Sequence, residues 1–165
     1  MKVRVVIDVE MCRVRAITKG YPHRNEIIQI GAVMMNEAYE VLDKFSTFVK
    51  PRFGSIDRYI LRLTGISDKN IKNAPDVEKA FEELLQWAGN NEVLFYSWSD
   101  ADYHQIRNEI MWKCKENRRW ELLLDRNNWI DYQKSFGERL GSAKLLKLTE
   151  ALEWAEVDTD RKSVV

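Results

Sequence analysis

The run VRVVIDV at residues 3–9 constrains the fold more than any other stretch of this sequence. It is short and rich in β-branched residues, which is typical of a strand in the centre of a sheet. Side chains alternate between the two faces of a strand, so Asp8 and Glu10 share one face. The apolar side chains on the opposite face are Val3, Val5, Ile7 and Val9. The pattern predicts a sheet that is buried on one face and carries two neighbouring acids on the other.

The elements that follow predict a mixed sheet. Residues 26–35 and 40–49 have the pattern of two further strands, and the short turn between them favours an antiparallel meander with the first strand. Strands at 92–97 and 128–131 then alternate with helices. The helices are expected at 57–66, 77–89, 101–117, 132–139 and 143–155. The predicted fold class is α/β: a mixed five-stranded sheet, an antiparallel meander followed by parallel strands, flanked by helices.

Two of these helices have clear apolar faces. In helix 77–89 the face consists of Val77, Ala80, Phe81, Leu84, Leu85 and Ala88. The last helix is expected to begin at Ser142, a good N-cap residue. The residues that we expect it to bury are Leu145, Leu148, Leu152 and Ala155.

Length and composition set the broad class. The 165 residues suit one domain, and we treat residues 1–165 as a single domain. Lys+Arg and Asp+Glu both total 26, so net charge argues neither for nor against a nucleic-acid partner. Cys12 and Cys114 lack zinc-site spacing, and free thiols in a reducing cytoplasm are the simplest interpretation. We find no signal peptide and no membrane span, so a cytoplasmic protein without membrane contact is expected.

The paired acids favour a metal site. Two like charges side by side repel unless a cation or hydrogen-bond donors neutralise them, and oxygen ligands suit Mg²⁺. The alternative is that both acids are simply solvated at the end of the strand. Asp100 and Asp102 follow the strand 92–97, at the carboxyl end where open α/β sheets build their sites. Asp100 is also well placed as an N-cap, whereas Asp102 would meet the first pair if the two strands are neighbours.

Several stretches together resemble the DEDDh-type 3′–5′ exonucleases of the RNase H-like superfamily, among them ribonuclease T, polymerase III proofreading domains and sporulation-inhibitor-type exonucleases. The matching stretches are VVIDVEMC, NEIIQIGAVMMNE, FSTFVKPRF, LTGISDKNIKNAPDVEKAFEELLQW and YSWSDADYHQI, which span roughly residues 3–155. The resemblance implies an RNase H-like fold. It also implies that Asp8, Glu10 and Asp102 are catalytic metal ligands, with Asp100 as the fallback for the third.

The same resemblance implies an activity and its partners. The family hydrolyses phosphodiester bonds at 3′ ends of single-stranded RNA or DNA by a two-metal-ion mechanism, with two Mg²⁺ or Mn²⁺ ions in the complete site. Backbone groups of Met11 and Cys12 would touch the terminal nucleotide. Leu63, Thr64 and Ile66 match the stretch that packs on its base or sugar. Trp98 is a candidate for base stacking, although burial in the core is the more ordinary role for a Trp at a strand end.

The family's third motif, a His followed by an Asp about five residues later, is missing where the resemblance predicts it. We expect either that the C-terminal end of the domain is incomplete or that the chain is a catalytically silent nucleic-acid-binding module. A third alternative is that Asp158 or Asp160 substitutes for the missing ligand. His104 lies two residues past Asp102 and therefore on another side of the helix.

Two basic segments complete the predictions. The segment 11–24 has the composition of an irregular loop with four basic residues and no acid, and either gathers phosphates near the acids or is merely solvated. Residues 107–126 mix both charge signs, among them Glu109 and Lys113, and are interpreted mainly as a solvated helix and loop. The sequence does not indicate an oligomeric state.

Overall fold

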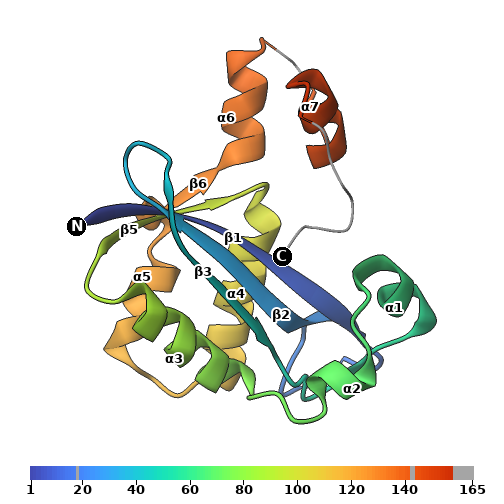
Figure 1. Cartoon of the computed structure of the whole chain (residues 1–165). Coiled ribbons are helices and arrows are strands. Elements are labelled where there is room, and N and C mark those ends of the chain that lie inside the picture. The colour runs from blue at the N-terminus through green and yellow to red at the C-terminus, as the bar shows by residue number, and fades with distance from the viewer. Residues whose placement is uncertain (18, 142–143, 158–165) are drawn as a thin grey trace.

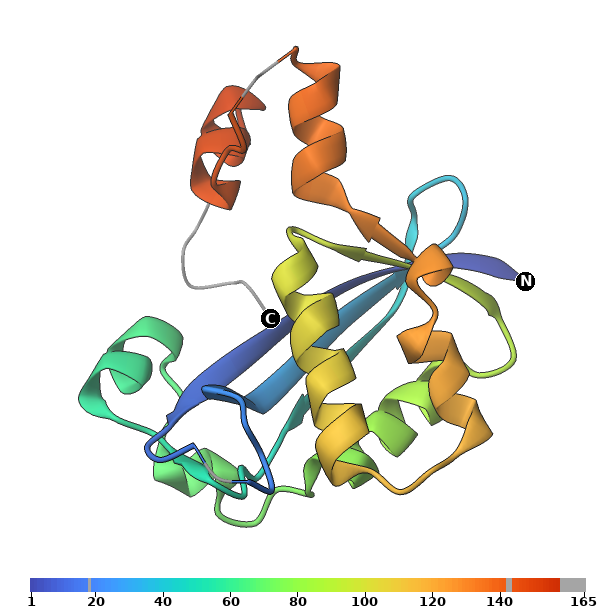
Figure 2. The same ribbon diagram turned by 180° about the vertical axis from the view of Figure 1, so that it is seen from behind.

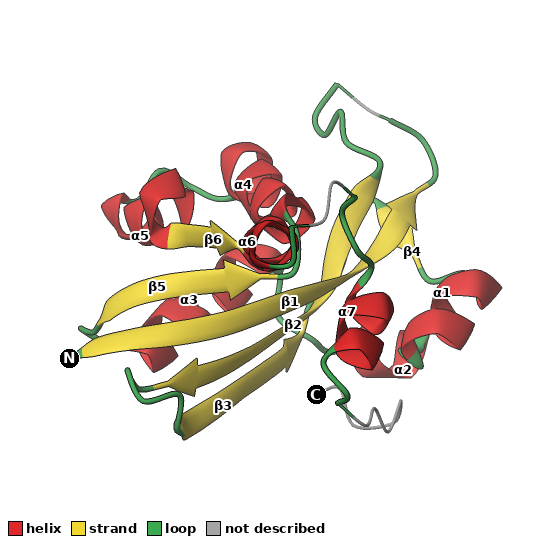
Figure 3. Ribbon diagram, turned by 90° about the horizontal axis from the view of Figure 1, so that it is seen from above, coloured by secondary structure: helices red, strands yellow, loops and turns green. Residues whose placement is uncertain are grey.

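The computed structural model describes residues 1–17, 19–141 and 144–157. Its sheet has the strand order β3-β2-β1-β5-β6 (Figure 1). The two-residue β4 pairs with the end of β1 (Figure 3). The strands are β1 (Lys2–Val14), β2 (Asn25–Met35), β3 (Val41–Phe48), β4 (Gly54–Ser55), β5 (Glu92–Ser97) and β6 (Trp129–Asp131). β1, β2 and β3 form an antiparallel meander, and β5 and β6 extend the sheet in parallel with β1. The mixed α/β sheet predicted from the sequence is therefore confirmed.

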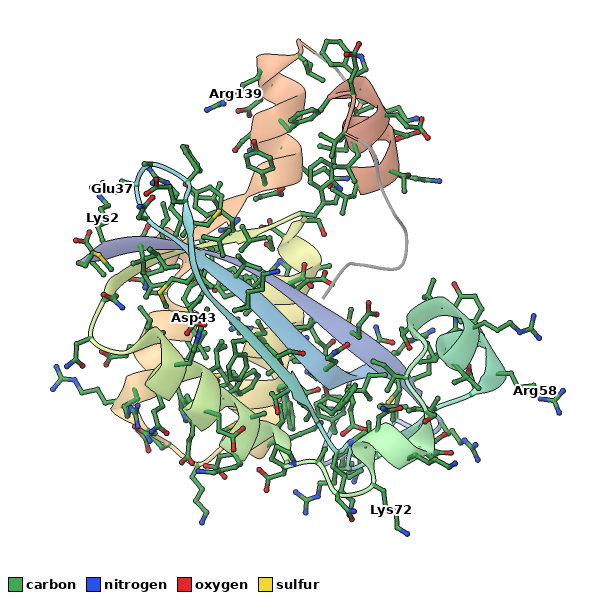
Figure 4. All side chains as sticks on the ribbon, viewed as in Figure 1. Lys2, Glu37, Asp43, Arg58, Lys72 and Arg139 are labelled. Atoms are coloured by element: carbon green, nitrogen blue, oxygen red, sulfur yellow. The ribbon has the colours of Figure 1, made fainter. Side chains whose placement is uncertain are left out.

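The five predicted helices are present with shifted bounds, and two short helices, at residues 68–71 and 121–124, were not predicted. They are α1 (Arg58–Thr64), α2 (Asp68–Ile71), α3 (Val77–Ala88), α4 (Asp100–Lys113), α5 (Glu121–Leu124), α6 (Tyr132–Arg139) and α7 (Leu148–Trp154), with 3-10 turns at Arg118–Trp120 and Arg126–Asn128. All six apolar residues predicted for the face of α3 are buried. Gly65 ends α1 in the left-handed conformation, with a φ of 73° that glycine adopts without steric cost. Charged side chains such as Arg58, Lys72 and Arg139 point away from the ribbon (Figure 4).

The main core lies on one face of the sheet. The inward side chains of β1, at positions 3, 5, 7 and 9, are all buried and pack with residues from α3 and α4. Figure 2 shows α4 lying across the strands with α5 and α3 beside it. The opposite face of β1 carries Val6, Asp8 and Glu10, and the first two of these are exposed. The alternation in the sequence thus predicted correctly which face of β1 is buried.

A second, smaller core closes the far end of β1. Cys12 and Ile28 from the sheet pack with Ile60 of α1, with Ile66 between α1 and α2, and with Ile71 of α2. Seen from above, α1 and α2 lie at the end of the sheet opposite α5 (Figure 3). This cluster attaches α1 to the strand that carries the paired acids.

Several elements differ from the sequence prediction in their bounds, and one short strand was not predicted. β1 continues to Val14, so residues 11–14 are strand and not the start of a loop, because Arg13 and Val14 gain a partner in β4. β4 makes the sheet six-stranded, and a two-residue strand has no periodicity by which to find it. α4 ends at Lys113 rather than near 117, and its C-cap Cys114 is extended.

The prediction for the last helix was wrong in its start and in its buried face. α7 begins at Leu148 after the N-cap Lys147, and Ala151 is its buried residue. Leu145 and Leu148 are exposed, because α6 and α7 project together beyond the carboxyl ends of β5 and β6 rather than packing on the sheet (Figure 1). The predicted N-cap Ser142 lies outside the described residues.

The prediction of a solvated segment at 107–126 was also wrong for two charged residues. Glu109 is fully buried, and the Lys113 side chain is 7% exposed. Lys113 forms ion pairs with Glu109 and with the buried Glu26 of β2. Each charge therefore has a partner in the interior, which local composition does not reveal.

Candidate active site

β5 ends before β1 does, so the edge of β1 next to Asp8 and Glu10 has no neighbouring strand on that side in the described part of the chain. The parallel pairing of β1 with β5 stops at Val6 and Tyr96, and β5 ends at Ser97. The backbone N–H of Val9 therefore has no strand partner on that edge. Asp102 takes this place: its Oδ1 accepts the Val9 N–H at 3.2 Å. A carboxylate from α4 thus lies at the one residue of β1 that separates Asp8 from Glu10.

The first turn of α4 explains why Asp102, and not Asp100, reaches the strand. Ser99 is the N-cap, and its hydroxyl oxygen accepts the N–H of Ala101 at 3.3 Å, so the predicted N-cap role of Asp100 was wrong. Asp100 instead pairs with Arg126 at 2.6 Å. This pair holds Asp100 on the outside of the helix. Of the two aspartates in the first turn of α4, only Asp102 therefore contacts β1.

Electrostatics show that the three acids share one environment. Burial raises the pKa of Asp102 to about 7, and the charges of Asp8 and Glu10 add to the rise against the opposing Val9 N–H. Burial also raises the pKa of Asp8. The pKa of Glu10 is raised mainly by burial and further by the charge of Asp8. Asp8 nevertheless keeps an exposed side, whereas Asp102 is 7% exposed. The three groups repel one another, and a bound cation would relieve this repulsion.

The three carboxylates have the right chemistry for a hard divalent ion, but their side chains are not close enough together to hold one. Carboxylate oxygens are the ligands that Mg²⁺ and Mn²⁺ prefer. Within the described residues, however, no group of three or more His, Cys, Asp or Glu is arranged closely enough to hold a metal ion. No Lys or Arg of the described part of the chain forms an ion pair with Asp8, Glu10 or Asp102 either. Asp158 and Asp160, predicted as substitute ligands, lie outside the described residues.

The other predicted site residues border these acids to different degrees. Leu63 on α1 is 66% exposed, whereas Ile66 is buried in the second core. The Thr64 hydroxyl accepts the Ile66 N–H at 3.0 Å and donates to the Ile60 carbonyl at 2.9 Å, so it caps the end of α1. Leu63 is therefore the one of the three side chains that is free to touch a ligand.

Met11, Cys12 and Trp98 lie next to the acids along the chain. Met11 packs against the main core, and Cys12 is fully buried in the second, so the backbone contacts of these two residues with a nucleotide stay a prediction. The Trp98 ring packs against Tyr132 and Phe136 of α6, with ring centroids 6.2 and 6.0 Å away. Trp98 is thus only partly buried and packs on α6 rather than in the core that was named as its ordinary place. His104 is exposed on α4 and stacks edge-on against Tyr103.

A model of the RNase T exonuclease family matches residues 5–157. The chain belongs to this exonuclease family. Relatives include the PolC-type DNA polymerase III of Caldanaerobacter subterraneus subsp. tengcongensis, 38% identical over 85 residues, and that of Thermotoga petrophila, 29% identical over 146. The alignments cover 51% and 87% of this chain but 5% and 9% of those polymerases. The chain thus spans less than a tenth of these relatives.

Solved structures of DEDDh exonucleases have the same fold. The nuclease domain of 3′hExo, a DEDDh family member bound to rAMP, has a TM-score of 0.76 at 20% identity, covering 96% of this chain and 81% of that one. A 3′-exonuclease that recognises the histone mRNA stem-loop has a TM-score of 0.79 at 18% identity, covering 96% and 72%. The RNase H-like fold implied by the sequence is confirmed. No helix in the described part of the chain is long and apolar enough to cross a membrane.

Sequence reasoning missed the groups that hold the site residues in place. Arg126 pairs with Asp100 and holds this acid away from the other three. Arg126 lies in a segment without periodicity, so the sequence gives no signal for this pair. Glu26, Glu109 and Lys113 form the buried ion pairs described above. A spacing of four residues between Glu109 and Lys113 is the one local signal, and it is equally common on solvated helices.

Proposed function

We propose that this chain is a metal-dependent 3′–5′ exonuclease domain that acts on single-stranded RNA or DNA. The observation that carries the proposal is the hydrogen bond from the Val9 N–H to Asp102, because it brings a third carboxylate between Asp8 and Glu10. The family of the chain makes phosphodiester hydrolysis the reaction that such acids would serve.

Asp8, Glu10 and Asp102 would hold the metal ions. Bound ions of this kind polarise the scissile phosphate and generate hydroxide from water at neutral pH. The carboxylates themselves supply oxygen ligands whose mutual repulsion favours cation binding. Mg²⁺ and Mn²⁺ both suit them, and two ions per site are what we expect when the site is complete.

The region around α1 would orient the terminal nucleotide. Leu63 offers an exposed apolar surface, and an unstacked base or sugar can pack on it. The backbone of Met11 and Cys12 continues directly from Glu10 and would contact the same nucleotide. Single-stranded ends suit such a surface, because their bases are free to leave the stack.

A catalytically silent nucleic-acid-binding module is the second candidate. It is favoured by the finding that no group of metal-binding side chains in the described residues is close enough to hold an ion. Such a module would keep the surface near α1 without turnover.

Timed digestion of 5′-labelled single-stranded RNA and DNA separates the two functions. The full chain is incubated with Mg²⁺ or Mn²⁺, beside the variant Asp8→Asn/Glu10→Gln and the matched control Asp100→Asn, which removes a neighbouring acid outside the site. We expect shortening from the 3′ end with the wild type and the control but not with the double variant. Binding of the labelled strand without shortening would favour the silent module, and shortening by all three proteins would refute the assignment of these acids.

A further inference from the structure

A buried network of charges lies two helical turns along α4 from Asp102. Glu109 is fully buried, and its Oε1 accepts the Ile27 N–H of β2 at 2.8 Å. Lys113, one turn further, lies between Glu109 and Glu26 and pairs with both. Gln105 also donates to Glu109 at 3.1 Å. The carboxylate of Glu109 is therefore held from several sides at one orientation.

The Ile27 N–H lies beside an irregularity in the sheet. The register of β1 against β2 shifts between Glu10 and Met11: Glu10 faces Gln29, but Met11 faces Ile27. A bulge of this kind bends a strand and re-aims the side chains next to it. The extra residue is Ile28 of β2, so the bulge lies in the strand opposite the step from Glu10 to Met11. Because Glu109 accepts the N–H of the adjacent Ile27, its side chain holds β2 at this bulge, and β2 in turn pairs with Glu10 through Gln29.

The same helix is also attached at a second point. Asp102 and Glu109 are seven residues apart, which is about two turns, and so they share one side of α4. Each accepts a backbone N–H from the sheet, Asp102 from Val9 of β1 and Glu109 from Ile27 of β2. Two bonds to two strands fix both the rotation of the helix and its position along its axis.

Glu26 extends this attachment towards α1. Its carboxylate accepts the N–H groups of Arg52 at 2.9 Å and Phe53 at 2.7 Å, and also that of Gly54. These residues lead through β4 into α1. Lys113 therefore joins the helix that carries Asp102 to the segment that precedes the exposed Leu63.

We propose that Glu109, held in place by Lys113, is a positioning residue that aligns Glu10 and Asp102. Their role as metal ligands rests on the proposed function, whereas the alignment itself is a property of the fold. Glu109 touches neither acid. It acts on Glu10 through the bulge and on Asp102 through the rigid turns of α4.

Amide hydrogen exchange measured by NMR tests the alignment directly and without metal. In the variant Glu26→Gln/Glu109→Met/Lys113→Met, neutral side chains of similar size replace all three members of the buried charge network, so no buried charge loses its partner, and such replacements often preserve folding. We expect the Val9 amide to exchange at least tenfold faster than in the wild type, relative to the Val5 and Phe95 amides. A purely structural role would accelerate all three amides by the same factor, and that result would overturn the proposal.

Two further variants keep the test decisive if the triple variant does not fold. Glu109→Asp keeps the charge but shortens the side chain by one CH₂, and we expect the same selective loss of protection at Val9. Glu109→Gln keeps an oxygen that accepts the Ile27 N–H, and we expect it to restore protection to within about threefold of the wild type. Unchanged Val9 exchange in Glu109→Asp would overturn the proposal.

Binding of Mn²⁺, followed by calorimetry, connects the alignment to the site. We expect at least tenfold weaker affinity in Glu109→Asp and an unchanged affinity in the control Lys79→Met, which removes the exposed pair between Lys79 and Glu82. Equal affinity in all three proteins would overturn the positioning role. If the wild type binds no Mn²⁺, the proposed function fails, and the exchange of the Val9 amide still decides the alignment.

Discussion

Replacing Asp102 by Asn should stabilise the metal-free protein in a pH-dependent manner. The amide oxygen of the new side chain can still accept the Val9 N–H, so the hydrogen bond stays while the charge is removed. In the wild type that charge is costly, because burial raises the pKa of Asp102 from 3.8 to about 7 and the charges of Asp8 and Glu10 contribute to the rise. The substitution therefore removes a buried, repelled carboxylate without breaking its contact.

The magnitude follows from proton linkage. The folded wild type binds the Asp102 proton more tightly than the unfolded chain does, so its stability falls as pH rises from about 4 to about 7. Each pH unit in that window costs about 1.4 kcal/mol, and the total approaches about 4 kcal/mol above pH 7. The Asp102→Asn variant has no carboxyl group at this position and therefore does not lose this free energy of unfolding. Its advantage should be near zero at pH 4 and about 4 kcal/mol at pH 8.

Urea unfolding in EDTA at pH 4 to 8 measures this difference. The matched control is Asp100→Asn, whose partner Arg126 lies at the surface, so that its effect should stay within about 1 kcal/mol at every pH. An Asp102→Asn variant that gains no stability between pH 4 and pH 8 would refute the reasoning. So would an equal gain at all pH values, because a titrating carboxylate cannot produce it.

Three further outcomes are expected. Mn²⁺ should raise the melting temperature of the wild type more at pH 8 than at pH 6, and differential scanning fluorimetry should find no such rise in Asp8→Asn. Leu63→Ala should leave urea unfolding nearly unchanged but weaken binding of a single-stranded oligonucleotide about threefold or more, and equal affinity by fluorescence anisotropy would contradict the role of this side chain. Gly54→Ala should cost about 1–3 kcal/mol in urea unfolding, because the added Cβ would lie 2.5 Å from the Cys12 Sγ; an unchanged midpoint would show that the two segments can separate.

The sequence predicted those parts of the fold where a single period persists. Alternation over 3–9 identified the buried face of β1, and the helical period over 77–88 identified every inward residue of α3. The same reasoning failed for α7, because a helix that does not pack on the sheet has no reason to bury its apolar stripe. Periodicity states which face is apolar, but the tertiary structure decides whether that face is covered.

The site was predictable to a similar degree. The Asp-x-Glu spacing places two acids on one face from strand geometry alone. That Asp102 rather than Asp100 joins them depends on the N-cap at Ser99 and on a salt bridge to Arg126, which is 26 residues from Asp100. The burial of Glu109 depends on Ile27, which is 82 residues away from it in the sequence. It also depends on Lys113, whose second partner Glu26 is 87 residues away from Lys113. Such pairings have no local signature, so only the structure reveals them.

The distance along the chain between β1 and α4 has a consequence for folding. The bond between Val9 and Asp102 spans 93 residues, and the parallel pairing of β1 with β5 that precedes it spans a similar length. Contacts of such long range close late and slow the folding of a domain. During synthesis, β1 therefore lacks its partners in β5 and α4 until these segments have left the ribosome. The three acids therefore come together only after more than half of the chain has been made, which leaves β6, α6 and α7 to be added afterwards.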